Sequence, residues 1–286
     1  MATTLTVVIG PTSSGKSKLA IEMATQSGAQ IISADAFQVY RGLSIGTGKT
    51  PLMDRHDVPH HLIDIREPIQ RYCVSDFMHL SNTLISTLHA QHIPVIVCGG
   101  TAFYLHAFIH QLGFESLPYD ESLRASLTKT WSHQSGIAIW QHLYRLDPST
   151  ALAIPVAQSQ KVLRALEVWM LTGKSMISQQ SIPIRRKNCR VIGLNPAREL
   201  LIKQIYHRIE SMIENGWVEE VEVLLKKGIP ESCPAFKAIG YKEIAHYLNG
   251  GMTFTQMIES IKTKTRQFSK RQMTWFKHFK DVEWIF

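Results

Sequence analysis

The sequence predicts an α/β fold, in which a parallel sheet flanked by helices is interrupted by an all-helical insert. Three observations lead to this expectation. Short apolar runs alternate with segments of helical periodicity over the first hundred residues, and a glycine-rich loop follows the first apolar run. Strand signals then stop near residue 117 and return only near residue 190. Strands that alternate with helices pair in parallel, with helices on both faces of the sheet.

The elements of the first hundred residues follow from apolar spacing and from the positions of glycine and proline. In chain order we expect a strand over 5–9, a glycine-rich loop over 10–17, a helix over 17–27, a strand over 31–33, a helix over 76–91 and a strand over 94–98. Gly99 and Gly100 close the last of these strands. The sequence therefore predicts three parallel strands with two connecting helices in this region.

The middle of the chain has helical character alone. Helices are expected over 120–132, 136–143 and 160–171. Strand character returns over 190–194, and helices follow it to the C-terminus. We therefore expect two domains. Residues 1–115 and 189–286 form the α/β core with C-terminal helices, and residues 116–188 form the helical insert.

Length and composition bound the class of protein. The chain has 286 residues, of which 44% are apolar and 19% charged, a mixture that excludes a disordered or fibrous protein. Its longest apolar runs, such as residues 93–98, are too short for a membrane span of about 20 residues, and no basic segment precedes the first strand. The four cysteines are far apart and form no CxxC pair, which argues against a zinc cluster and favours a reducing cytoplasm.

The charge balance points to a polyanionic partner. Lys and Arg exceed Asp and Glu by 31 to 23, and basic residues gather with aromatic ones between residues 262 and 284. This mixture suits single-stranded nucleic acid, whose phosphates attract the cations and whose bases stack on aromatic rings. An amphipathic helix with its aromatic residues in the core and its lysines in solvent would have the same composition.

The glycine-rich loop has the pattern of a phosphate-binding P-loop. Every fixed position of G-x-x-x-x-G-K-[ST] is present, with a strand before the loop and a helix after it, in the run Gly10, Pro11, Thr12, Ser13, Ser14, Gly15, Lys16 and Ser17. Such a loop directs backbone N–H groups at a diphosphate or triphosphate, Lys16 adds a positive charge, and the Ser17 hydroxyl is a ligand for Mg²⁺. No apolar strand ending in paired acidic residues follows, which is atypical of a motor ATPase.

Asp35 follows the second predicted strand and is a candidate for chemistry. The carboxyl ends of parallel strands meet at one edge of the sheet, so Asp35 should face the phosphate loop. From position alone, its carboxylate could bind Mg²⁺ through water, accept a proton from a substrate or cap a helix.

Many short segments together resemble the tRNA dimethylallyltransferases, also called tRNA isopentenyltransferases. Besides the phosphate loop, the matching segments, in the same order and spacing, are 33–35, 38–42, 45–47, 58–64, 99–101 with Tyr104, 163–167, Gly216 with 219–221, 238–243, 265–267, 270–272 and 274–276. The resemblance implies a P-loop NTPase-like sheet and transfer of a dimethylallyl group to N6 of the adenosine immediately 3′ of the anticodon. The loop would hold dimethylallyl diphosphate rather than ATP, with assistance from Mg²⁺.

The same resemblance implies roles for individual residues. Asp35 would be the general base for the adenine amino group, with Thr101 at the same centre, and Arg208 a second contact to the diphosphate. The alternative for Arg208, less favoured, is a surface arginine of an amphipathic helix. The expected contacts to the tRNA anticodon stem-loop are Asp35, Ala36, Phe37, Gln38, Thr101, Arg124, Gln160, Lys161, Val162, Leu163, Arg164, Lys237, Gly240, Tyr241, Lys242, Lys270, Arg271, Gln272, Trp275 and Lys277.

Three positions depart from simple expectation. Ala36 and Phe37 replace the Ser and the Arg or Met usual in the family, and Phe37 could compensate by stacking on the flipped adenine. The spacing of Trp275 from Phe268 and Arg271 favours a place in the core over an RNA contact.

Two other functions stay open at this point, and a monomer is expected. A P-loop small-molecule kinase would share the loop and the sheet, but would leave Gly240-Tyr241 and residues 270–275 without a role. A non-catalytic RNA-binding protein would explain the charge but not the intact set of Lys16, Asp35 and Thr101. His60 and His61 are adjacent and have no third ligand at metal-binding spacing, so a hydrogen-bonded loop is expected there.

Overall fold

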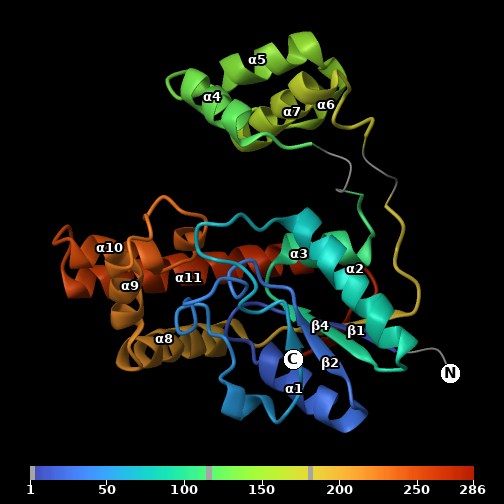
Figure 1. The fold of residues 1–286 in the computed structure, drawn as a ribbon, viewed down its shortest axis with the longest axis vertical. Helices are drawn as coiled ribbons and strands as arrows, with labels where there is room; N and C mark the ends of the chain where they lie inside the picture. Colours follow the sequence, from blue (N-terminus) through green and yellow to red (C-terminus); the bar gives the residue numbers. More distant parts are fainter. Residues whose placement is uncertain (1–3, 114–117, 180–182) are drawn as a thin grey trace. The chain divides into compact units, whose positions relative to one another are not determined.

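The computed structural model describes residues 4–113, 118–179 and 183–286 of the chain (Figure 1). Its six-stranded sheet has the order β3-β2-β4-β1-β5-β6, and all the pairings are parallel. The strands are β1 (Leu5–Ile9), β2 (Gln30–Ser33), β3 (His60–His61), β4 (Val95–Gly99), β5 (Cys189–Leu194) and β6 (Glu283–Ile285). The predicted parallel α/β fold is confirmed.

The helices of the first half connect and cover these strands. They are α1 (Lys16–Ser27), α2 (Val74–Ala90) and α3 (Ala102–Ile109), with a short 3-10 helix at Leu52–Arg55. After β5 the chain is helical again, in α8 (Arg198–Glu214), α9 (Trp217–Lys226), a 3-10 helix at Ala235–Lys237, α10 (Tyr241–Leu248) and α11 (Phe254–Phe276). The predicted helices over 17–27 and 76–91 agree with α1 and α2 to within two residues.

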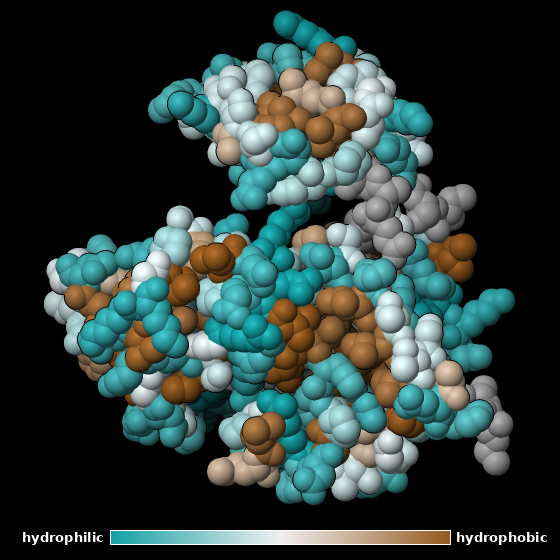
Figure 2. Space-filling model, viewed as in Figure 1, coloured by the Kyte–Doolittle hydropathy of each residue, from teal (hydrophilic) through white to brown (hydrophobic). Residues whose placement is uncertain are grey.

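The chain divides into two compact units, Met1–His110 with Arg185–Phe286, and Gln111–Ile184. The second unit contains α4 (Glu121–Trp131), α5 (Gly136–Leu146), α6 (Pro148–Ala153) and α7 (Ser159–Thr172), and no strand lies among its described residues. It has a core of its own around Leu143, Val162 and Leu166. The face of this unit seen in Figure 2 mixes polar and apolar side chains, and Ile137 and Leu152 are more than half exposed.

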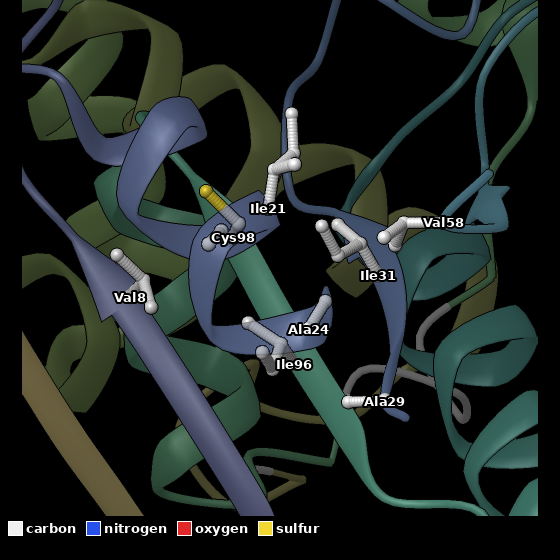
Figure 3. Close-up of a cluster of buried hydrophobic side chains, with 9 residues drawn as sticks. Val8, Ile21, Ala24, Ala29, Ile31, Val58, Ile96 and Cys98 are labelled. Atoms are coloured by element: carbon white, nitrogen blue, oxygen red, sulfur yellow. The ribbon is translucent and has the colours of Figure 1, made fainter. Parts of the chain in front are cut away.

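A tightly packed helix on the sheet positions the phosphate loop. Figure 3 shows side chains of α1, β1, β2 and β4 pointing toward one another, among them Val8, Ala24, Ile31 and Ile96. Ala20 and Ala24 are almost fully buried, and their small side chains allow α1 to approach the strands closely. The start of α1 is thereby fixed at the carboxyl end of β1.

Several elements are not predicted by the sequence patterns, and each has a physical reason. In α3 six of the eight residues are buried, so the segment lacks the polar face that makes a helix visible in a sequence. The strands β3 and β6 have only two and three residues, too few for a periodic signal. The helix α6 has six residues and begins at Pro148, because proline is favourable at a first helical position although it breaks a helix elsewhere.

Candidate active site

A cavity of about 550 Å³ lies at the carboxyl ends of β1, β2 and β4. The loops that follow these strands contribute the polar side chains, and α8, α11 and the turn before α10 contribute most of the remaining wall. The lining includes Thr12, Ser13, Lys16, Ser17, Asp35, Ala36, Phe37, Gln38, Thr101, Arg208, Lys237, Arg271, Gln272 and Trp275. The cavity therefore brings together predicted diphosphate ligands, both predicted catalytic residues and several predicted RNA contacts.

The phosphate loop has the backbone conformation that its glycines permit. Gly15 precedes α1 with φ 88°, in the left-handed region where a side chain would add strain. Gly10 is confined in another way, since a Cβ there would lie 2.7 Å from the Ser14 hydroxyl oxygen. The loop consequently turns sharply into the N-terminus of α1, where free N–H groups and the helix dipole favour an anion.

Lys16 lies half-buried in this cavity and has no carboxylate partner among the salt bridges of the described residues. Its Nζ donates a hydrogen bond to the Pro11 carbonyl oxygen at 3.2 Å. Burial lowers the pKa of Lys16, and the nearby Arg208 acts in the same direction, while Cys98 and Asp35 oppose it. An anion beside a lysine favours its charged form, so a phosphate bound at the loop would offset the effect of burial on Lys16.

Asp35 and Thr101 hold the same short loop from two sides. The Asp35 Oδ1 atom accepts hydrogen bonds from the backbone N–H groups of Phe37 at 2.8 Å and Gln38 at 3.2 Å. The Thr101 Oγ1 atom accepts one from the Ala36 N–H at 3.0 Å. Asp35 thus closes an Asx turn rather than capping a helix, and its carboxylate still lines the cavity. This geometry orients the carboxylate without enclosing it.

Arg208 reaches the cavity from the middle of α8. Burial lowers the pKa of its guanidinium, and Asp35 opposes that effect, so the two side chains lie within electrostatic reach. A Cβ on Gly48 would overlap the Arg208 guanidinium, so the loop and the guanidinium are in direct contact, and the φ of 61° at Gly48 favours glycine. The surface-arginine interpretation is wrong, because the side chain is enclosed at the cavity wall.

The loop that packs against Arg208 is held by a carboxylate that the sequence does not single out as a functional residue. Glu220 of α9 accepts hydrogen bonds from the backbone N–H groups of Ser44, Ile45 and Gly46 at 2.7, 2.8 and 3.2 Å. The Tyr241 hydroxyl donates to Glu220 at 2.7 Å. No local sequence pattern predicts this contact, because Glu220 and the loop are more than 170 residues apart in the chain.

Some of the residues predicted to contact RNA are buried. Val162 and Leu163 belong to the core of the helical unit. Tyr241 is fully buried beneath Glu220, Gly240 packs against the ring of Trp217, and Gln272 is 4% exposed. The family segments that contain these residues therefore also supply core residues, and the RNA contacts assigned to them stay predictions.

The other predicted RNA contacts are accessible. Exposed residues among them are Gln160, Lys161, Lys237, Lys242, Lys270, Arg271, Trp275 and Lys277. The expected core position of Trp275 is wrong, since the side chain is 45% exposed, lines the cavity and packs edge-on against Phe103. The aromatic residues of α11 that do enter the core are others, chiefly Phe276. Of these exposed residues, Lys237, Arg271 and Trp275 line the cavity, so that two cations and an indole lie at its wall.

The basic cluster at residues 185–190 has internal partners. Arg186 stacks over the Phe108 ring at 4.1 Å and donates to Asn82 at 2.7 Å. Arg190 pairs with Glu283 at 2.6 Å, which ties β5 to β6. The loop expected at His60 and His61 is wrong, because the two residues form β3 and pair with β2, and the His61 ring shares a hydrogen bond with the Gln30 side chain at 2.7 Å. The described residues contain no group of three or more His, Cys, Asp or Glu that could hold a metal ion, and no helix among them is long and apolar enough to cross a membrane.

A P-loop followed by a helix, an opposing carboxylate and a basic rim define a P-loop group transferase that acts on a polyanionic substrate. The comparisons with known proteins narrow this class. A family model described as IPP transferase matches residues 38–279. The chain belongs to this IPP transferase family, whose members include the tRNA dimethylallyltransferases.

The chain is similar to curated relatives over almost its full length. It is 38% identical to the tRNA dimethylallyltransferase of Pelotomaculum thermopropionicum, covering 98% of this chain and 90% of the relative. The enzyme of Geobacillus thermodenitrificans is also 38% identical, with 100% and 91% covered. The sequence resemblance to this family is confirmed.

Solved structures agree in fold. The tRNA isopentenylpyrophosphate transferase of Bacillus halodurans superposes with a TM-score of 0.73 at 36% identity, covering 99% of this chain and 89% of that one. A eukaryotic dimethylallyltransferase described as acting on tRNA superposes with a TM-score of 0.80 at 27% identity, covering 96% and 70%. The prediction of a tRNA-modifying prenyltransferase is confirmed, and a small-molecule kinase is not favoured.

Proposed function

We propose that this chain transfers a dimethylallyl group from dimethylallyl diphosphate to N6 of the adenosine immediately 3′ of the anticodon in tRNA. The observation that carries the proposal is the cavity that Lys16 and Arg208 share with Asp35 and Thr101. One pair is cationic and suits a diphosphate, and the other is suited to an amino group that must lose a proton.

Each step of the proposed transfer can be assigned to a residue of the cavity. The adenine N6 forms a bond to the allylic carbon while the bond from that carbon to the diphosphate oxygen breaks. Lys16, Arg208 and the loop N–H groups stabilise the negative charge that develops on the leaving diphosphate. Asp35 accepts the proton released from N6, and Thr101 keeps the Asp35 loop in place through the Ala36 N–H. Apolar residues of α8, such as Ile205 and Ile209, line the same cavity and suit the five-carbon chain.

Mg²⁺ fits the donor set at the start of α1. The Ser17 hydroxyl lines the cavity beside Lys16, and Mg²⁺ usually keeps several waters and shares one or two protein oxygens with substrate phosphates. When bound there, the ion would neutralise charge on the diphosphate. The scarcity of acidic ligands is compatible with this mode, because the phosphates and waters complete the coordination.

In this proposal, the RNA approaches the cavity along exposed basic residues on or next to α11. Lys270, Arg271 and Lys277 on or next to α11 would bind phosphates, while Phe37 and Trp275 offer rings on which an extruded base can stack. Arg124, Gln160, Lys161 and Arg164 would bind the RNA from the helical unit. A monomeric state and a cytoplasmic location remain predictions.

Labelled donor tests this function directly. We would incubate the protein with dimethylallyl diphosphate carrying label in the prenyl group and with a synthetic anticodon stem-loop that contains the target adenosine. Label should enter the RNA and be lost when the target adenosine is replaced by guanosine. Parallel reactions with γ-labelled ATP should leave the RNA unlabelled. Transfer from ATP, or no transfer from the prenyl donor, would contradict the proposal.

A further inference from the structure

Gln272 joins the two loops that carry opposite halves of the proposed chemistry. Its side chain projects from α11 and is 4% exposed. The Oε1 atom accepts a hydrogen bond from the backbone N–H of Thr12, in the phosphate loop, at 2.8 Å. The Nε2 atom donates to the Gly100 carbonyl oxygen, one residue before Thr101, also at 2.8 Å. One amide thus bridges the diphosphate side and the acceptor side of the cavity.

The fit around this bridge is close. A Cβ on Gly100 would lie 2.6 Å from the Gln272 Nε2 atom, so a larger residue in the turn after β4 would displace the amide from its present position. Lys16 lies behind the same glycine, with its Cε and Nζ atoms 3.6 Å from that Cβ position. The amide, the Gly100 turn and the Lys16 side chain therefore occupy one packed layer.

The chemistry of the bridge requires an amide. The phosphate loop presents a donor and the Gly100 turn presents an acceptor, and only a side chain with an acceptor and a donor at its tip serves both. Glutamate in its charged form can accept from Thr12 but repels the Gly100 carbonyl oxygen. Leucine has similar bulk and satisfies neither group, leaving the part-buried Thr12 N–H and the Gly100 carbonyl oxygen without their partner.

We infer that Gln272 is a positioning residue that fixes the separation between the phosphate loop and the Gly100–Thr101 turn, and not an RNA contact. The inference rests on the proposed function, since only a reaction between two bound substrates makes that separation matter. The Thr12 N–H is directed to Gln272, which leaves the later N–H groups of the loop for the diphosphate. A shift of about 1 Å between reacting groups can lower a rate by about 10²-fold.

The test compares Gln272→Leu with Gln267→Leu, a glutamine on the exposed surface of the same helix. The single-turnover rate is measured at saturating donor and stem-loop RNA, together with donor KM, RNA Kd and thermal unfolding. Gln272→Leu should lower the rate by about tenfold or more and raise donor KM, with RNA Kd within about twofold of wild type. Gln267→Leu should match wild type in rate and donor KM.

A second variant distinguishes a lost hydrogen bond from a misfolded protein. Gln272→Glu retains the acceptor for Thr12, so it should lower the rate while changing donor KM less than Gln272→Leu does. An unchanged rate per folded molecule with a lower Tm would make Gln272 merely structural, and weaker RNA binding at an unchanged saturated rate would make it an RNA contact. Either result overturns the inference. A wild-type protein that transfers no label would instead contradict the proposed function.

Discussion

Replacing Glu220 by glutamine should loosen the loop that carries Gly48 against Arg208. In the wild type the Glu220 carboxylate accepts hydrogen bonds from three backbone N–H groups and from the Tyr241 hydroxyl. A glutamine keeps one oxygen for Ser44 and Ile45, and Tyr241 can rotate to accept from the new NH₂ group. The Gly46 N–H then loses its acceptor, at a cost of about 1–3 kcal/mol, and the two remaining bonds lose their charge assistance.

These contributions add up to about 3 kcal/mol of unfolding free energy. For a domain of about 150–250 residues, this corresponds to a decrease in Tm of about 6–12 °C. Donor KM should rise as well, because the loop that carries Gly48 packs against the Arg208 guanidinium. Unfolding would be followed by circular dichroism against temperature and urea, and donor KM by steady-state transfer of labelled prenyl groups.

Glu219→Gln is the matched control. Glu219 and Glu220 both lie in the first turn of α9, so each substitution removes a charge that favours the helix N-terminus by about 0.3–1 kcal/mol. Glu219 is exposed, whereas Glu220 binds the loop. The difference between the two variants isolates the loop contact. Equal effects of the two substitutions on Tm and donor KM would refute the reasoning.

Three further substitutions test the proposed roles. Lys16→Ala should raise donor KM and lower kcat with RNA Kd nearly unchanged; wild-type kinetics would remove the loop as donor site. Asp35→Asn cannot accept the proton, so the single-turnover rate should fall by about 10²–10⁴-fold, and a rate within about threefold of wild type would exclude a general base. Lys270→Ala with Arg271→Ala should flatten the salt dependence of RNA binding by about one to two units, with donor binding unchanged; an unaltered slope with lower stability would make both residues structural.

The fold was largely predictable because its signals are local. A glycine-rich loop between a buried strand and a helix, followed by alternating apolar and helical segments, defines the sheet around β1, β2 and β4. Elements without local contrast were missed: α3 is buried on nearly all sides, and β6 depends on pairing with a strand about 90 residues earlier. Pairing of that kind is decided by tertiary packing, which leaves no periodic pattern in the sequence.

The site residues likewise differ in whether a local sequence signal predicts them. Lys16 and Asp35 lie just after strands whose carboxyl ends meet at one edge of the sheet, so the sequence alone predicts that they lie close together. Gln272 and Glu220 act on loops more than 170 residues away, and their roles depend on which face of a helix turns inward. A family motif identifies such residues without distinguishing an RNA contact from an internal bridge. Helical spacing does not distinguish the two either, because the spacing of Trp275 is compatible with core or surface, and its side chain is exposed.

The arginines of the helical unit illustrate how a buried carboxylate can serve a surface function. Glu167 is fully buried, and its Oε2 atom lies 3.2 Å from the Arg124 Nη1 atom and 2.9 Å from the Arg164 Nη1 atom. Both guanidinium carbons also lie 6.0 Å from the ring centre of Tyr119. Such a cluster costs desolvation and is a poor source of stability. What it supplies is orientation: both arginines are held in place before RNA arrives, so less side-chain entropy is lost when a phosphate binds. The predicted role of Arg124 and Arg164 as phosphate ligands is therefore compatible with their internal ion pairs.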